Sequence, residues 1–93
     1  MSESVMNQLL EEGIDKKLAA NVHHLTTAMT VFDGTVTLDV IAMELASRQA
    51  GFRSEFASLL VLNCLKVAEE YGFVKLTEKG YYYLTEKGQD AYQ

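Results

Sequence analysis

Two adjacent histidines and a single cysteine are the residues whose types could suggest metal or nucleophilic chemistry. His23 and His24 are neighbours on a predicted helix and therefore point about 100° apart, and no cluster of cysteines or carboxylates accompanies them. We expect a surface and a half-buried histidine rather than a metal site. The helical pattern around Cys64 places its thiol on a core-facing side, which favours packing over nucleophilic catalysis.

The acidic residues could be read as acid–base pairs, but nothing in their spacing holds two of them across a pocket. They fit helix caps and solvated faces better, and they include Asp15, Asp33, Asp39, Glu11-Glu12 and Glu69-Glu70. The run Tyr81–Tyr82–Tyr83 could stack on bases, although aromatic residues of an ordinary strand are the simpler interpretation. We expect neither an enzyme nor a bound cofactor or metal.

Composition limits the classes of protein. The chain has 93 residues, 48% hydrophobic and 23% charged, which is ordinary for one globular domain. No apolar run approaches about 18 residues, and the acidic start, MSESVMNQLLEE, does not resemble a signal peptide. One cysteine suits a reducing compartment. We therefore expect a cytoplasmic protein with no membrane partner. Its net charge of −5 weakens any interaction with phosphate groups.

Glycines divide the chain into elements, since proline is absent. A short helix is predicted over residues 4–12, and Asp15 is a good N-cap for a second helix. That helix carries an apolar stripe at Leu18, Val22, Leu25, Met29 and Phe32. Residues 35–37 predict a brief strand, and Thr37 then caps a helix running to about Ser47. Ser54 is predicted to cap a helix over residues 55–71, which Gly72 ends.

The pentapeptide LTEKG occurs twice, at residues 76–80 and 84–88. Around the first copy, alternation predicts a hairpin with a three-residue loop, Glu78-Lys79-Gly80, and Gly80 in the left-handed region. Val74 then faces Leu84 and Leu76 faces Tyr82, so one face of the hairpin is wholly apolar. A two-residue loop would mix the faces. In the second copy, Thr85 is expected to cap a last helix over residues 86–92, which Gly88 weakens.

Three segments carry a resemblance to a known family: TLDVIAMELA, then VAEEYGFVKL, then YYYLTEKG. Together they resemble the winged helix-turn-helix regulators of bacteria and archaea, over roughly residues 15–92. The resemblance implies a mainly α fold with a small β-hairpin and divides the chain into an N-terminal helical extension, 1–14, and a winged-helix domain, 15–93. It also implies that helix 55–71 enters the major groove of duplex DNA and that the hairpin loop is the wing. A transcriptional regulator is the expected function.

The outward face of helix 55–71 supplies the candidate contacts. At 100° per residue this face contains Glu55, Phe56, Leu59, Asn63, Lys66 and Glu70. Side chains that can read bases are amides, hydroxyls and cations. The candidate nucleic-acid contacts are Arg53, Ser58, Asn63 and Lys66, with Lys75 and Lys79 on the hairpin for the DNA backbone.

The same face supports a second interpretation. Phe56, Leu59 and Leu62 would form an exposed apolar patch, which usually marks a contact surface, so the fold could serve a protein partner instead of DNA. The N-terminal helix raises a related question, because a small winged helix has a core without it. Val5 and Leu9 could pack against a second copy in a homodimer, or the helix could fold back on its own domain.

Overall fold

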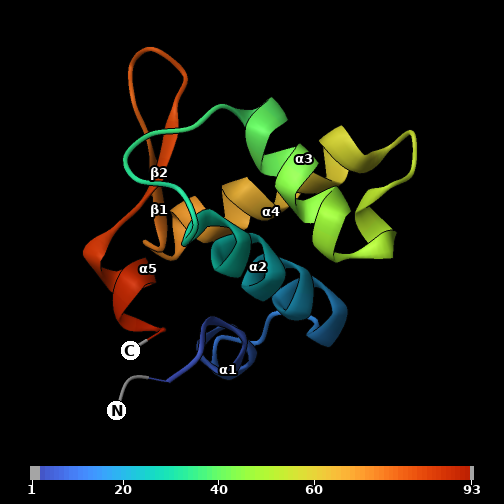
Figure 1. Ribbon diagram of the computed structural model, residues 1–93. Helices are drawn as coiled ribbons and strands as arrows, with labels where there is room; N and C mark the ends of the chain where they lie inside the picture. The colour runs from blue at the N-terminus through green and yellow to red at the C-terminus, as the bar shows by residue number, and fades with distance from the viewer. Residues whose placement is uncertain (1–2, 93) are drawn as a thin grey trace.

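Helices make up most of the part of the chain that the computed structural model describes, residues 3–92, and a small two-stranded antiparallel hairpin completes it (Figure 1). The prediction of a mainly α chain with a β-hairpin is confirmed. In order, the elements are α1 (Val5–Glu11), α2 (Lys16–Met29), α3 (Leu38–Arg48), the 3-10 helix η1 (Ala50–Phe52), α4 (Ala57–Glu70), β1 (Val74–Leu76), β2 (Tyr82–Leu84) and α5 (Glu86–Asp90).

Side-chain caps explain where most helices begin. The Asp15 carboxylate accepts hydrogen bonds from the backbone N–H groups of Lys17 and Leu18, at 3.1 and 3.3 Å. Thr37 accepts in the same way from Val40 at 3.4 Å, and Thr85 from Gly88 at 3.1 Å. Each bond satisfies an N–H group that the first turn of a helix leaves without a partner. The predicted caps Asp15, Thr37 and Thr85 are therefore confirmed.

The start of α4 differs from the prediction. Ser54 accepts a hydrogen bond from the N–H of Phe56 at 3.3 Å, and its carbonyl accepts from Ala57 at 3.1 Å. These bonds close a tight turn ahead of the helix, so α4 begins at Ala57 with Phe56 in the N-cap position and no side-chain cap. The helix predicted over residues 55–71 is shorter at both ends, and Ser54 is not its cap.

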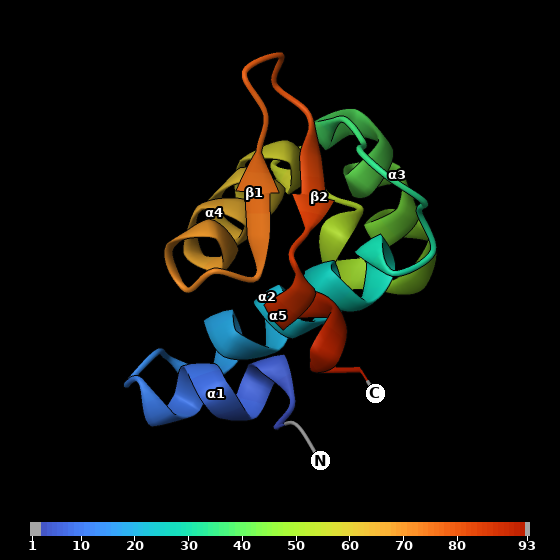
Figure 2. The ribbon, with the colours of Figure 1, turned by 90° about the vertical axis from the view of Figure 1, so that its left-hand side faces the viewer.

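The core surrounds α2, which has α1 on one side and α3 and α4 on the other (Figures 1 and 2). Val22, Leu25 and Met29 of the predicted stripe are buried, whereas Leu18 and Phe32 are only half-buried. Ile41 and Leu45 of α3 and Val61 and Leu65 of α4 complete the centre. Two buried aromatic residues, Phe52 and Phe73, were not predicted as core.

The N-terminal helix folds back on its own chain. Val5 and Leu9 are fully buried and belong to the same apolar cluster as α2, and Figure 2 shows α1 lying beside α2 at the base of the molecule. The prediction that these two side chains contact a second copy is wrong, because their surface is already removed from water within one chain. Leu10, on the other side of α1, stays exposed.

The hairpin has the predicted register, Val74 opposite Leu84 and Leu76 opposite Tyr82. Thr77 and Tyr81 close a three-residue loop, since the N–H of Thr77 donates to the carbonyl of Tyr81 at 2.7 Å. Gly80 has φ of 87°, the left-handed value that favours glycine. The strand predicted over residues 35–37 is reduced to one bridge, in which Val36 and Tyr82 exchange both backbone hydrogen bonds.

The second LTEKG copy ends in α5, which stops at Asp90 rather than at residue 92. Gly88 is buried there, and a Cβ at that position would lie 2.3 Å from the carbonyl oxygen of Phe73. Beyond α5, the hydroxyl of Tyr92 contacts the side chains of Thr26 and Thr27 and donates to the carbonyl of His23 at 3.2 Å. These contacts tie the end of the described chain to α2. No helix within residues 3–92 combines the length and the apolar character needed to cross a membrane.

Candidate functional site

Helix α4 presents one buried and one exposed face, as its sequence predicts. Val61, Cys64, Leu65 and Ala68 are buried. The outward stripe is exposed throughout, and it changes in character along the helix: Phe56 and Leu59 come first, Asn63 and Lys66 follow, and Glu70 ends it. The polar half of α4 can therefore offer an amide and an ammonium to a ligand, while its first turn offers apolar surface.

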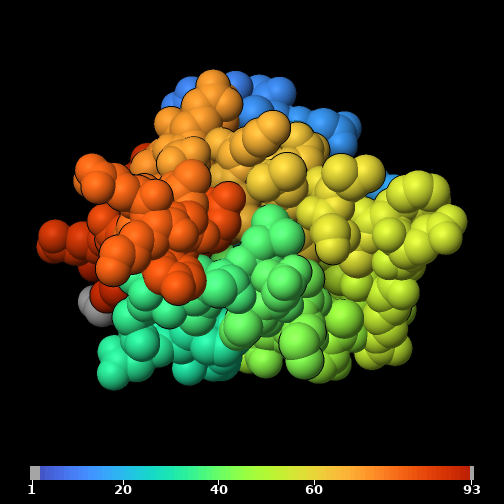
Figure 3. All heavy atoms as spheres, turned by 90° about the horizontal axis from the view of Figure 1, so that it is seen from above, coloured from blue at the N-terminus to red at the C-terminus, as the bar shows by residue number. Residues whose placement is uncertain are grey.

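The hairpin and the two helices α3 and α4 lie side by side on one face of the molecule (Figure 3). Lys75 and Lys79 of the hairpin are exposed, as are Ser58 and Lys66 of α4. Among residues 3–92 the only ion pair joins Nε of Arg48 to Oε1 of Glu44, at 2.9 Å. The three lysines are therefore cations that no described carboxylate neutralises at close range.

Arg53 is placed differently from the other candidate contacts. Its Nε–H donates to the carbonyl of Ala46 at 2.6 Å, which links the segment before α4 to the end of α3. Part of the guanidinium group is thus committed to holding the fold, and the rest remains exposed. A substitution at Arg53 would change both the charge and the loop.

Within residues 3–92, the most exposed large apolar side chains lie on α3 and at the start of α4. Met43 is 73% exposed, Leu59 67% and Phe56 64%, whereas Leu62 is half-buried. Phe56 and Leu59 lie where the sequence predicts, but Met43 was missed. Its spacing could have identified it, because Met43 is two positions from both Ile41 and Leu45, so it points away from the side of α3 that they bury.

The histidines and the cysteine occupy packing positions. His23 is half-buried, and burial, assisted by nearby His24, lowers its pKa. Its Nδ1 is enclosed without a hydrogen-bond partner among the described residues. Burial raises the pKa of the Cys64 thiol to about 11, so the thiolate is scarce at neutral pH. Within residues 3–92 no group of three or more His, Cys, Asp or Glu side chains is placed to hold a metal ion.

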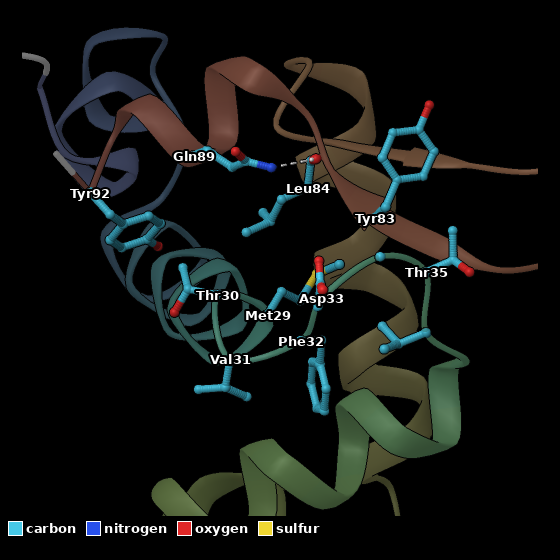
Figure 4. Close-up of a pocket in the computed structure, with 12 residues that line it drawn as sticks. Met29, Thr30, Val31, Phe32, Asp33, Thr35, Tyr83, Leu84, Gln89 and Tyr92 are labelled. Atoms are coloured by element: carbon cyan, nitrogen blue, oxygen red, sulfur yellow. Dashed lines mark hydrogen bonds between the residues drawn. The ribbon is translucent and has the colours of Figure 1, made fainter.

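An open cavity of about 690 Å³ lies on another part of the surface, between the end of α2, the loop to α3, β2 and α5 (Figure 4). Its wall contains one continuous segment, residues 29–36, together with Tyr83, Leu84, Gln89 and Tyr92. Of the tyrosine run, Tyr82 pairs with Val36, Tyr81 is exposed and Tyr83 lines this cavity. The sequence pattern did not predict the cavity, since its wall joins segments about 50 residues apart.

Comparisons of the chain with protein-family models, with curated proteins and with solved structures gave no match.

Proposed function

We propose that this chain is a winged helix-turn-helix protein of the transcriptional-regulator type, which binds duplex DNA with α4 in the major groove and the hairpin as its wing. The order of elements supports this proposal. Helix α2 leads through the single bridge at Val36 to α3, α4 and the hairpin, and Val36 lies beside β2 as a third, one-residue strand would. The sequence resemblance over residues 15–92 points the same way.

The observation that carries DNA binding is the set of cations beside α4 that form no ion pair with any carboxylate of residues 3–92. Lys66 lies on the exposed stripe of α4, and Lys75 and Lys79 extend from the adjacent hairpin. Phosphate contacts of this kind supply most of the affinity of DNA-binding proteins, and each releases bound counterions. Asn63 and Ser58 add groups that can hydrogen-bond to base edges. Because the whole chain carries a charge of −5, we expect binding to be strong only at low salt.

Binding of the purified protein to mixed genomic DNA fragments, at several salt concentrations, tests the proposal. Replacing Lys79 or Lys66 with Ala removes one cation, so the slope of log K against log salt should fall by about one unit for each. Lys17→Ala, at the exposed start of α2, is the matched control and should leave the slope unchanged. Equal slopes in all four proteins, or no retention of DNA at low salt, would refute the assignment of this face.

A second function, contact with a protein partner and no DNA, is favoured by a specific observation: in the described part of the chain, Met43, Leu59 and Phe56 are the three most exposed large apolar side chains. Exposed apolar patches mark interaction sites more often than single exposed residues do. If this function holds, Leu59→Asp should abolish association with the partner while the fold is retained, and the acidic exterior should select basic partners. Leu62 is half-buried, so its substitution is a less clean test than that of Leu59.

Three further expectations belong to the same proposal: a homodimer, a cytoplasmic location and no catalytic activity. The homodimer no longer involves Val5 and Leu9, which are buried within one chain. The mass of the protein in solution at two concentrations tests it directly. A dimer would be expected to bring two α4 helices to half-sites one helical turn of DNA apart, and a monomer would predict a single short site.

A further inference from the structure

The cavity between α2, the loop to α3, β2 and α5 contains none of the residues proposed for DNA or protein contact. Its volume of about 690 Å³ lies within the usual range for small-molecule sites, roughly 300–1,000 Å³. Figure 4 shows lining side chains from two distant parts of the sequence: Leu84, Gln89 and Tyr92 point toward the middle of the group, whereas the rings of Tyr83 and Phe32 point outward. The cavity is therefore large enough for a small-molecule ligand.

The walls suit an apolar body. Met29, Phe32, Val36 and Leu84 contribute aliphatic and aromatic surface, and Tyr83 and Tyr92 add two rings. Val31 also lines the cavity and is 53% exposed. Covering such surface is favourable in proportion to the apolar area removed from water.

The polar groups of the cavity determine the charge of the ligand. Among the described lining residues Asp33 is the one charged side chain, and none of them is a lysine, arginine or histidine. Within residues 3–92 the Asp33 carboxylate makes no ion pair. Gln89 donates its Nε2–H to the carbonyl of Leu84 at 3.5 Å, which leaves the Gln89 side-chain oxygen free to accept. The hydroxyls of Thr30, Thr35, Tyr83 and Tyr92 can donate or accept, so the Asp33 carboxylate is the group that favours a cationic ligand.

We infer that this cavity binds a small organic cation, an amine that carries one aromatic or compact apolar group. The apolar group lies against Met29 and Leu84, and the ammonium group lies at Asp33. A carboxylate or phosphate ligand is disfavoured because it meets Asp33 with like charge and finds no cation in the wall. The wall includes Val36 and β2, which the backbone pairing joins, so a bound amine bridges the hairpin and the end of α2.

Three ring compounds of nearly equal size test this inference on the full chain: 2-phenylethylamine, 2-phenylethanol and phenylacetate. Each is titrated into isotope-labelled protein, and the backbone amide signals are followed by NMR. We expect saturable shifts at residues 29–36 and 83–92, with the amine binding most tightly and the acid most weakly. Shifts scattered over the surface, no saturation at millimolar concentration, or tightest binding of phenylacetate would overturn the inference.

Substitutions at two exposed positions, Asp33 and Val31, distinguish the contribution of charge to ligand affinity from that of apolar contact. Asp33→Asn should weaken the amine about three- to fivefold, as expected for a partly solvated ion pair, and leave the alcohol unchanged. Asp39→Asn, an exposed carboxylate on α3 outside the cavity, is its matched control. Val31→Asn should weaken the amine and the alcohol alike, by about two- to fourfold, with Val40→Asn as control.

An unchanged affinity of the amine for Asp33→Asn would refute the assigned role of that carboxylate. These measurements use the protein alone, so their outcome does not depend on whether it binds DNA. If DNA binding is also found, adding the amine during the DNA titration shows whether the cavity regulates it.

Discussion

Glycine has different roles in the two LTEKG copies. Gly80 sits in the hairpin loop with φ of 87°, and a Cβ there would meet nothing within 4 Å, so its role is conformational. Gly88 lies in α5 with ordinary helical geometry, yet a Cβ would lie 2.3 Å from the Phe73 carbonyl oxygen and 3.0 Å from a methyl group of Leu84. Its role is steric. The same residue type is thus required for two unrelated physical reasons.

Gly88→Ala should destabilise the protein, although alanine is the better helix former by about 1 kcal/mol. The added methyl group must push α5 away from a backbone carbonyl, and overpacking of this kind costs roughly 1–3 kcal/mol. The midpoint of urea unfolding measures the effect. Gly51→Ala is the control, since that position is open and its φ is not positive. Equal midpoints for the two variants would contradict the close approach of α5.

His23 should make stability depend on pH in the weakly acidic range. Burial and nearby His24 lower its pKa in the folded state below the ordinary value of 6.5. The unfolded chain then binds more protons, so the free energy of unfolding is unaffected by this group well above pH 6.5 and falls as the pH drops below it. The enclosed Nδ1, which has no hydrogen-bond partner among the described residues, gives the physical reason.

Urea unfolding at pH 7.5 and at pH 5.5 measures this dependence, in a range where carboxylates contribute little. The loss of stability between the two pH values should disappear in His23→Gln and persist in His24→Gln. A loss of the same size in His23→Gln would assign it to another group.

Among the elements, α1 contains two neighbouring leucines that differ in burial. Leu9 is fully buried against α2, and Leu10 is 39% exposed. Leu9→Ala should cost about 2–5 kcal/mol of stability, because it leaves a cavity in the core. Leu10→Ala should cost less than about 1 kcal/mol. Chemical unfolding at two protein concentrations checks both values. A loss in Leu9→Ala that grew on dilution would restore the idea that this side chain lies between two copies.

The hairpin and α5 show how an element gains stability from its neighbours. Two strands of three residues are marginal by themselves, but Val74 is buried in the core and Tyr82 pairs with Val36. Helix α5 has only five residues, too few to be stable alone. Thr85 fixes the start of α5: its hydroxyl donates a hydrogen bond to the Gly72 carbonyl and accepts one from the N–H of Gly88. Lys87 adds a hydrogen bond to the Tyr71 carbonyl at 2.7 Å.

At the scale of the whole molecule, one apolar cluster joins the first helix to the hairpin, so we expect cooperative unfolding. Cys64 is a natural probe of that event, since its thiol is buried within the cluster and its pKa is about 11. A thiol reagent should label the native protein very slowly. The labelling rate should rise with urea in parallel with global unfolding. Rapid labelling in water would show that α4 opens locally.

Several features could be read from the sequence because they depend on near neighbours. The caps at Asp15, Thr37 and Thr85 use bonds across two or three residues, and the hairpin register follows from alternation around a loop that needs glycine. The exposed stripe of α4 follows from helical periodicity, which also placed Asn63 and Lys66 outside. Local geometry is sufficient in each case, so the sequence by itself determined these features.

Other features were decided by contacts between distant segments, which only the tertiary structure contains. Whether Val5 and Leu9 face a second copy or their own chain depends on the surface that α2 leaves free, and periodicity is the same in both cases. Ser54 caps a turn rather than a helix because the chain must turn from η1 into α4. The cavity at Asp33 lies between residues 29–36 and the segment 83–92, and Gly88 approaches the carbonyl of Phe73. Neither contact can be predicted from a local sequence pattern.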